Sequence, residues 1–187
     1  MLDIMLDLET MGTKVTAPIV AIGAVEFDRR DGSIRDQLYW KVSLASAVKC
    51  GAVIEPDTVL WWMQQSDAAR AQLTGQGIEL DAALTHFDIW LSRLRMTKGV
   101  CGNGADGGVR IWGDGAHFDN ALLKAAYERH DLRVPWTYKE NACYRTMKDL
   151  RPDVVIERRP GTEHHALDDA VHQARHLAAI LKALGLV

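Results

Sequence analysis

Acidic side chains stand in separate parts of this 187-residue sequence, at points where a predicted strand ends or a predicted helix begins. Asp7 and Glu9 close an apolar run at the start of the chain, and residues two apart on an extended segment face the same side. Asp119 follows a predicted strand and precedes a predicted helix. Neighbouring carboxylates repel each other unless a cation lies between them, and oxygen-rich clusters suit Mg²⁺ or Mn²⁺. These residues therefore indicate a divalent-cation site.

A second polar set stands near the other end of the sequence, where residues 164–170 read His-His-Ala-Leu-Asp-Asp-Ala. Apolar residues recur at helical spacing from Ala166 to Leu181, which predicts a terminal amphipathic helix. At about 100° per residue, Asp168 and Asp169 lie on opposite edges of the apolar stripe, so helical geometry does not choose between them. Either acid could bind a metal, and both could equally be solvated residues at a helix start.

Three histidines, His165, His172 and His176, share the polar side of this helix near Asp169, so a zinc site is an alternative. HxxxH spacing without a third partner is common on solvated faces, however. Four acids that bind two cations would instead leave one histidine able to take a proton from water. That division of roles is expected for metal-assisted phosphodiester hydrolysis.

The segments between these residues predict one α/β domain with a mixed sheet, spanning residues 1–187. An alternating strand, residues 2–7, precedes a buried strand, 19–27, and a third strand, 34–44, which together form an antiparallel hairpin meander. A further strand is expected over 109–112, an irregular or strand-like segment from Pro135, and a surface loop over 99–108. Helices are expected over 56–63, 66–73, 81–94, 120–129 and 144–150, the third of them burying Leu84, Phe87, Ile89, Trp90, Leu91 and Leu94.

Composition excludes several other classes of protein. The net charge of −3 provides no broad basic field, so a nucleic acid would have to be held locally or through metal ions. The three cysteines are far apart and lack CxxC spacing, which argues against a disulfide framework and favours a reducing cytosol. Asp3 and Asp7 interrupt the first apolar run, and no other run reaches spanning length, so we expect a cytoplasmic protein without a membrane segment.

Taken together and in order, the polar motifs resemble the DEDDh family of 3′–5′ exonucleases, which have an RNase H-like fold. That family carries DxE, then FD before a helix, then HxAxxD, and the matching positions are Asp7-x-Glu9, Phe118-Asp119 and His164-x-Ala166-x-x-Asp169. The resemblance implies two bound divalent cations, Mg²⁺ or Mn²⁺, held by the four acids, with His164 as general base. The resemblance also selects Asp169 over Asp168 as the metal ligand and His164 over His165 as the general base.

Shorter matches over residues 7–13, 58–65 and 112–120 resemble a smaller branch of that family. This branch contains exodeoxyribonuclease VIII-like and phage DexA-like nucleases and mycobacterial RNase AS-like exoribonucleases. The resemblance assigns substrate binding to Leu8, Thr10, Met11, Gly12 and Trp62. Many DEDDh enzymes carry a bulky residue after the glycine of DxETxG, whereas this sequence has Thr13 there. Stacking on the terminal base would then fall to Met11 or to the adjacent tryptophans, Trp61 and Trp62.

The activity implied is metal-dependent 3′–5′ hydrolysis of single-stranded nucleic acid to nucleoside 5′-monophosphates. The resemblance leaves open whether the strand is DNA or RNA, and it allows a homodimer. Three alternatives fit the same residues less completely: a nucleic-acid-binding module of the same fold without catalysis, a proofreading subunit that works beside a polymerase, and a phosphodiesterase for small nucleotides.

Overall fold

A mixed five-stranded sheet with the strand order β3-β2-β1-β4-β5 forms the centre of the computed structural model, which describes residues 1–100, 108–156 and 161–187. β1 and β2 pair antiparallel, as do β2 and β3, whereas β4 and β5 extend the sheet in parallel from β1. The antiparallel meander predicted from the sequence is therefore confirmed. The strands are β1 (Leu2–Thr10), β2 (Ile19–Phe27), β3 (Ile34–Lys41), β4 (Val109–Gly113) and β5 (Asn141–Cys143).

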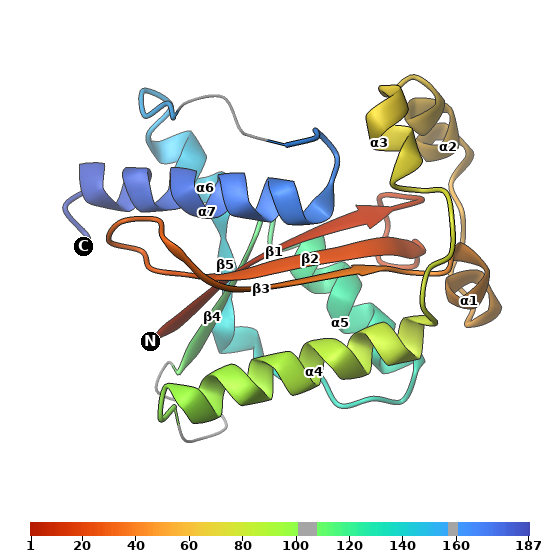
Figure 1. Ribbon diagram of the computed structural model, residues 1–187, viewed down its shortest axis with the longest axis horizontal. Coiled ribbons are helices and arrows are strands. Elements are labelled where there is room, and N and C mark those ends of the chain that lie inside the picture. The colour runs from red at the N-terminus through yellow and green to blue at the C-terminus, as the bar shows by residue number, and fades with distance from the viewer. Residues whose placement is uncertain (101–107, 157–160) are drawn as a thin grey trace.

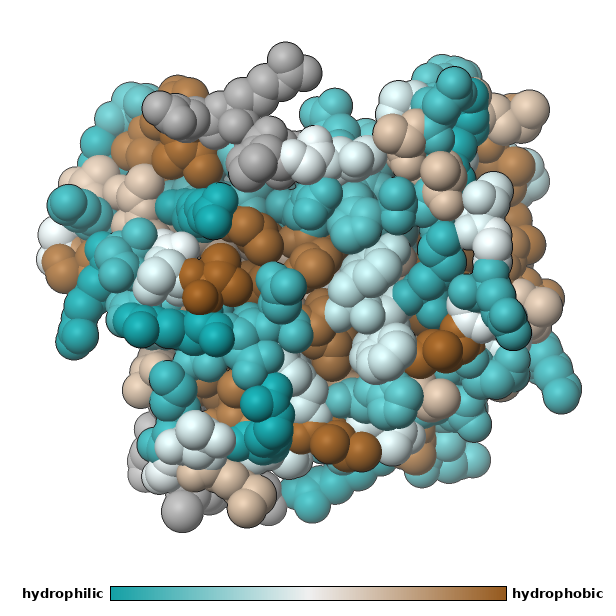
Figure 2. Space-filling model, viewed as in Figure 1, coloured by the Kyte–Doolittle hydropathy of each residue, from teal (hydrophilic) through white to brown (hydrophobic). Residues whose placement is uncertain are grey.

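Helices cover both faces of this sheet (Figure 1). α6 and α7 lie over one face, α4 and α5 over the other, and α2 and α3 lie beyond the carboxyl end of β1. The surface in Figure 2 is mostly hydrophilic, with hydrophobic residues in scattered patches. The helices are α1 (Leu44–Lys49), α2 (Pro56–Met63), α3 (Asp67–Ala71), α4 (Leu80–Thr97), α5 (Asp119–Arg129), α6 (Tyr144–Leu150) and α7 (Ala166–Ala183), and a 3₁₀ helix covers Tyr138–Glu140.

Alternation along β1 separates the two faces of the sheet. Leu2, Ile4, Leu6 and Leu8 pack into the core formed with α4 and α5, whereas Met5 packs into the core beneath α7. Successive side chains of a strand point to opposite faces, so the acids of β1 share the face of Met5. The sheet thus directs Asp3, Asp7 and Glu9 toward α7.

α7 approaches the sheet closely because both surfaces carry small residues where they meet. Ala166, Ala170 and Ala174 are fully buried on the helix. On β2, a Cβ atom added to Gly23 would lie 2.3–2.4 Å from backbone atoms of Ala166 and Leu167. Only glycine fits there, since neither backbone can move away cheaply. Gly23 pairs with Asp7 across the sheet, so the start of α7 lies beside that acid.

Several predicted boundaries were wrong. β1 continues to Thr10, and β3 ends at Lys41, after which Ser43 caps α1 by accepting a hydrogen bond from the Ser46 amide. Ile89 is 59% exposed although it was expected in the core, because it lies off the buried stripe of α4. Most of the loop expected over 99–108 lies outside the described residues. Within the described part of the chain, every helix is too short or too polar to span a bilayer.

Candidate active site

Three carboxylates from opposite ends of the sequence meet at the carboxyl end of β1. Asp7 and Glu9 lie on β1 and Asp169 lies in the first turn of α7, and each offers an oxygen within 4.8 Å of the others'. We call these three residues the carboxylate cluster. Among the described residues, it is the single group of three or more acidic, histidine or cysteine side chains close enough to hold a metal ion.

Asp119 adds a fourth carboxylate beside this cluster. β4 accompanies β1 only as far as the Leu6–Gly113 pair, so the Leu8 amide beyond it has no β4 partner. Asp119, at the first position of α5, accepts that N–H on Oδ1 at 3.2 Å. A Cβ on Gly113 would lie 2.9 Å from the Asp119 Cβ, so glycine is required for α5 to begin this close to β4.

Burial and neighbouring acids raise the pKa values of Asp7 and Asp119 and so disfavour their charged forms. Burial, followed by the charges of Asp119 and Glu9, raises the pKa of Asp7 well above its usual value. Burial also raises the pKa of Asp119 to about 7, against the lowering effect of the Leu8 hydrogen bond. Asp119 Oδ2 is buried and accepts no hydrogen bond from the described residues. A bound cation would stabilise the charged carboxylates, because it compensates their negative charges and is coordinated by the buried Asp119 Oδ2.

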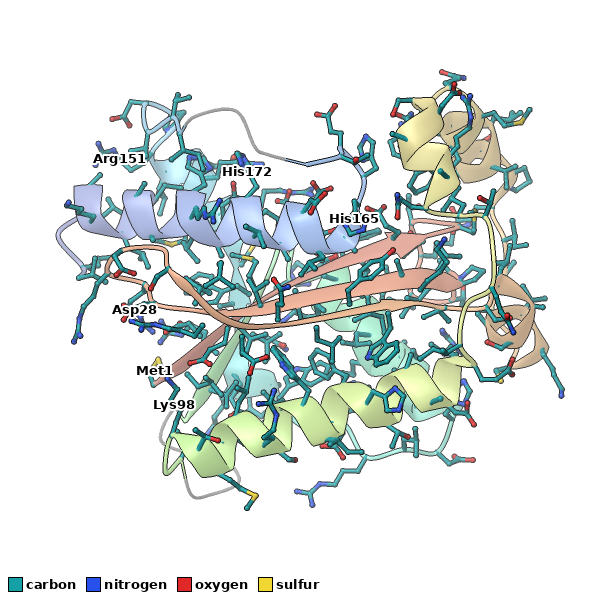
Figure 3. All side chains as sticks on the ribbon, viewed as in Figure 1. Met1, Asp28, Lys98, Arg151, His165 and His172 are labelled. Carbon is teal, nitrogen blue, oxygen red and sulfur yellow. The ribbon has the colours of Figure 1, made fainter. Side chains whose placement is uncertain are left out.

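The adjacent acids Asp168 and Asp169, at the start of α7, have different surroundings, as do the adjacent histidines that precede them. Asp169 is buried in the carboxylate cluster, whereas Asp168 turns aside and accepts the Thr162 amide at 2.9 Å. His165 is the N-cap of α7: its Nδ1 accepts the Asp168 amide at 3.3 Å, and its ring stacks on Tyr39 at 4.5 Å. Figure 3 labels His165 at the end of α7 that faces α2 and α3.

His164 precedes this cap in an unusual backbone conformation. Its φ of +60° lies in the left-handed region, which costs free energy for a residue with a Cβ and often marks a functional position. Its amide donates to Asp169 Oδ2 at 3.2 Å, which ties the histidine to the carboxylate cluster. Its ring meets the Trp61 ring edge-on at 4.8 Å and the Trp62 ring at 6.0 Å. His164 therefore lies between the acids and α2.

The two tryptophans of α2 have different surroundings. Trp62 is 3% exposed, and its Nε1 donates to the Thr10 carbonyl at 3.0 Å, so it anchors α2 to the end of β1. Trp61 is 42% exposed. Both line a cleft of about 520 Å³, which we call the α2 cleft, between α2 and the end of β1. Its lining residues are Leu8, Glu9, Thr10, Gly12, Thr13, Glu55, Asp57, Thr58, Trp61, Trp62 and Phe118.

Four of the five residues expected to bind substrate line the α2 cleft: Leu8, Thr10, Gly12 and Trp62. The fifth, Met11, is buried and packs with Trp62, Val20 and Ala69 behind the cleft wall. Trp61 and Phe118 supply further aromatic surface in the cleft, and of the three residues expected to stack on the base, Trp61 and Trp62 line it whereas Met11 does not.

The alternative zinc site on α7 does not assemble. His176 is held between two other groups, with Nδ1 2.7 Å from the Tyr144 hydroxyl and Nε2 2.8 Å from the Val154 carbonyl oxygen. A carbonyl only accepts, so Nε2 donates and Nδ1 accepts from the tyrosine. His172 lies with its ring 6.4 Å from the His176 ring. His176 thereby holds α6 and the following turn against α7.

Sequence reasoning missed Gln173, whose Nε2 donates to Asp7 Oδ1 at 2.7 Å. The available signal was its position on α7 one turn after Asp169, since residues four apart share a helix face. It also missed Gly23, whose importance depends on the strand register and the closeness of α7, which the sequence does not reveal.

The fold is similar to those of solved nucleases. The structure resembles the nuclease domain of 3′hExo, a DEDDh family member, bound to rAMP, at a TM-score of 0.63 and 13% identity, covering 100% of this chain and 94% of that one. It resembles exonuclease X in complex with 5′-overhanging duplex DNA at a TM-score of 0.55 and 17% identity, covering 99% and 94%. These likenesses confirm the expected RNase H-like exonuclease fold.

A third similar structure is E. coli exonuclease I in complex with a dT13 oligonucleotide, at a TM-score of 0.61 and 15% identity. The match covers 97% of this chain but only 41% of exonuclease I. No curated protein matches the sequence. Residues 2–181 match a family described as the 3′–5′ exoribonuclease Rv2179c-like domain. This match spans nearly the whole sequence, and the chain therefore belongs to the family of Rv2179c-like 3′–5′ exoribonuclease domains.

Proposed function

We propose that residues 1–187 act as a single exonuclease domain that removes nucleoside 5′-monophosphates from the 3′ end of single-stranded RNA. The observation that carries this proposal is the carboxylate cluster, with Asp119 beside it, at the edge of the α2 cleft. Asp7, Glu9 and Asp119 lie at the carboxyl ends of the neighbouring parallel strands β1 and β4, where open α/β sheets bind ligands, and Asp169 joins them from the first turn of α7. The adjoining cleft offers room for a terminal nucleotide.

The residues present fit two divalent cations, Mg²⁺ or Mn²⁺. All donors are carboxylate oxygens, the ligands that these hard ions prefer. Asp119 Oδ2 is a buried oxygen without a hydrogen-bond donor among the described residues, which a cation could use. Asp7, Glu9, Asp119 and Asp169 would hold the ions. When bound, these ions supply an activated water and compensate the charge of the departing 3′ oxygen.

His164 is the residue we assign as general base. Its backbone bond to Asp169 keeps it beside the carboxylate cluster, and its position before the helix cap leaves the side chain outside regular structure. A neutral imidazole there can accept the proton of the attacking water. His165 cannot exchange roles with it, since Nδ1 of His165 caps α7 and its ring stacks on Tyr39.

The α2 cleft would receive the terminal nucleotide. Trp61 presents a half-exposed ring for the base, and Trp62 fixes the cleft wall through its bond to the Thr10 carbonyl. We place RNA before DNA because the family is described as exoribonucleases and the 3′hExo structure holds rAMP.

A time course on a 5′-labelled single-stranded RNA and a DNA of matched sequence tests the activity, with Mn²⁺, with Mg²⁺ and with EDTA. We expect stepwise shortening of the RNA with either ion and none with EDTA. Asp119→Ala should abolish shortening, because it removes a ligand and leaves the Leu8 amide without its acceptor. Binding of RNA without any shortening would instead show a nucleic-acid-binding module, and cleavage of dinucleotides alone would show a small-nucleotide phosphodiesterase.

His164→Ala and His165→Ala form a matched pair that tests the base. We expect His164→Ala to lose most of the turnover and keep its Mn²⁺ affinity. His165→Ala should keep most of the turnover but lower the free energy of unfolding by about 1 kcal/mol, the usual cost of a lost helix cap. Near-normal turnover of the His164 variant would show that the base is assigned wrongly.

A further inference from the structure

Gln173 lies one turn after Asp169 on the face of α7 that covers β1. It is 8% exposed, among the buried alanines and leucines that pack α7 on the sheet. A long polar side chain in such surroundings loses hydration and needs a partner. Its partner is Asp7, and the 2.7 Å bond joins the last helix to the first strand.

This hydrogen bond restricts how Asp7 can turn. The Gln173 amide holds Oδ1, so rotation of the carboxylate would break a short bond in a buried environment. Glu9 and Asp169 approach Asp7 within the same cluster. Gln173 thereby fixes the orientation of one member of the carboxylate cluster.

The chemistry of the amide matters as much as its position. Glutamine donates without carrying a charge, whereas a lysine or arginine at this position would compensate the Asp7 charge and compete with a bound cation. Gln173 Oε1 is also buried and accepts no hydrogen bond from the described residues. Buried polar atoms of this kind are usually satisfied by ordered water or a bound group. Gln173 thus presents an uncharged donor to the carboxylate cluster, and its buried oxygen could accept a hydrogen bond from a water there.

We propose that Gln173 is a positioning residue that orients Asp7 for divalent-cation binding while leaving its negative charge uncompensated. This inference rests on the cation site of the proposed function. Groups that hydrogen-bond to metal ligands orient those ligands, and their loss typically weakens metal binding by about 10–100-fold.

Two substitutions separate orientation from charge. Gln173→Met keeps the length of the side chain but removes the donor, and we expect Mn²⁺ affinity, measured by titration calorimetry, to fall by about 10–100-fold. Gln173→Lys keeps a donor but adds a positive charge. We expect its Mn²⁺ affinity to fall at least as far, while the metal-free protein melts at a higher temperature than the Met variant. With RNA, the Met variant should lose kcat at fixed Mn²⁺ with little change in KM.

Gln76→Met, in the exposed loop before α4, is the matched control and should bind Mn²⁺ like the wild type. Melting of each metal-free variant shows whether it is folded. A folded Gln173→Met that binds Mn²⁺ as tightly as the wild type overturns the positioning role, and tight binding by Gln173→Lys overturns the requirement for a neutral donor. If the wild type itself binds no Mn²⁺, the proposed function fails, and this inference fails with it.

Discussion

Asp3 and Asp7 lie on the same strand and the same face, yet their surroundings differ. Asp3 is 4% exposed and accepts three hydrogen bonds at 2.6–2.9 Å from Nε and Nη2 of Arg29, and another at 2.9 Å from the Trp112 indole. Asp7 instead receives the neutral amide of Gln173 and lies among other acids. One acid has its charge compensated within the protein. The other lies where burial and neighbouring acids raise its pKa, so that its charged form is left for an added cation to stabilise.

The strand β2 shows the same contrast. Opposite Asp3 it carries Phe27, whose ring fills the core under α7, and opposite Asp7 it carries Gly23, which lets the start of α7 approach. The two ends of the paired strands β1 and β2 lie far apart in Figure 3: Met1, Asp28 and Lys98 are labelled near the end that carries Asp3, and His165 near the end that carries Asp7. A buried acid therefore indicates function through the charge and size of its neighbours, not through burial alone.

Replacement of Asp7 and of Asp3 by asparagine should give the largest contrast, with opposite effects on activity and on stability. Asp7→Asn should reduce RNA shortening to background and stabilise the metal-free protein, because it removes a charge from a repulsive group. Asp3→Asn should keep the activity but lower the free energy of unfolding by about 2 kcal/mol, since Arg29 loses its buried partner. Denaturant unfolding with EDTA measures the stability. If the Asp3 variant lost activity while its stability stayed normal, Asp3 would be a functional acid like Asp7 and not a structural one.

Gly23→Ala should produce the next largest effect. The new Cβ meets the backbone of Ala166 and Leu167, so α7 must shift and carry Asp169 away from β1. A displacement of about 1 Å can cost about 10²-fold in turnover. Phe27→Leu at the other end is the control, which should lose stability without losing Mn²⁺ affinity. A Gly23→Ala protein with normal Mn²⁺ affinity would mean that the position of α7 does not control the site.

The smallest expected effect is the pH dependence of metal-free stability. In the unfolded chain these carboxyls titrate near about pH 4, whereas in the folded protein the pKa of Asp119 is about 7 and that of Asp7 is also raised. The folded state therefore binds more protons at these two carboxyls between these values, so their contribution to stability is greatest below about pH 4 and is lost as the pH rises through about 7. Bound Mn²⁺ replaces those protons, so its stabilising effect should grow over the same range.

Melting temperatures with EDTA and with saturating Mn²⁺, at about pH 5.5 and about pH 8, check this linkage. Each 1 kcal/mol should appear as about 2–4 °C for a chain of this size. Asp7→Asn should reduce the change in metal-free melting temperature between the two pH values, and Asp3→Asn should leave that change as it is in the wild type. An equal Mn²⁺ effect at both pH values would show that the acids are already ionised without metal.

The sequence allowed the sheet and the acids to be predicted for different reasons. Periodicity and breakers located β2 and α6 to the residue, and the meander followed from the short turn between β2 and β3. The helix wheel could not choose Asp169 over Asp168, because both border the apolar stripe; the motif resemblance made that choice, and the structure places Asp169 among the acids. Gln173 and Gly23 were beyond prediction, since their contacts depend on how α7 lies on β1 and β2.

The assembly of the site from both ends of the sequence affects how the protein is made. On a ribosome, β1 emerges first, with Asp7 and Glu9, and α7 emerges after the whole sheet, with Asp169 and Gln173. A growing chain that has not yet released α7 lacks one carboxylate, the donor to Asp7 and the histidine before the helix. Under the proposed function, a growing chain gains the ability to degrade RNA only after translation has passed α7.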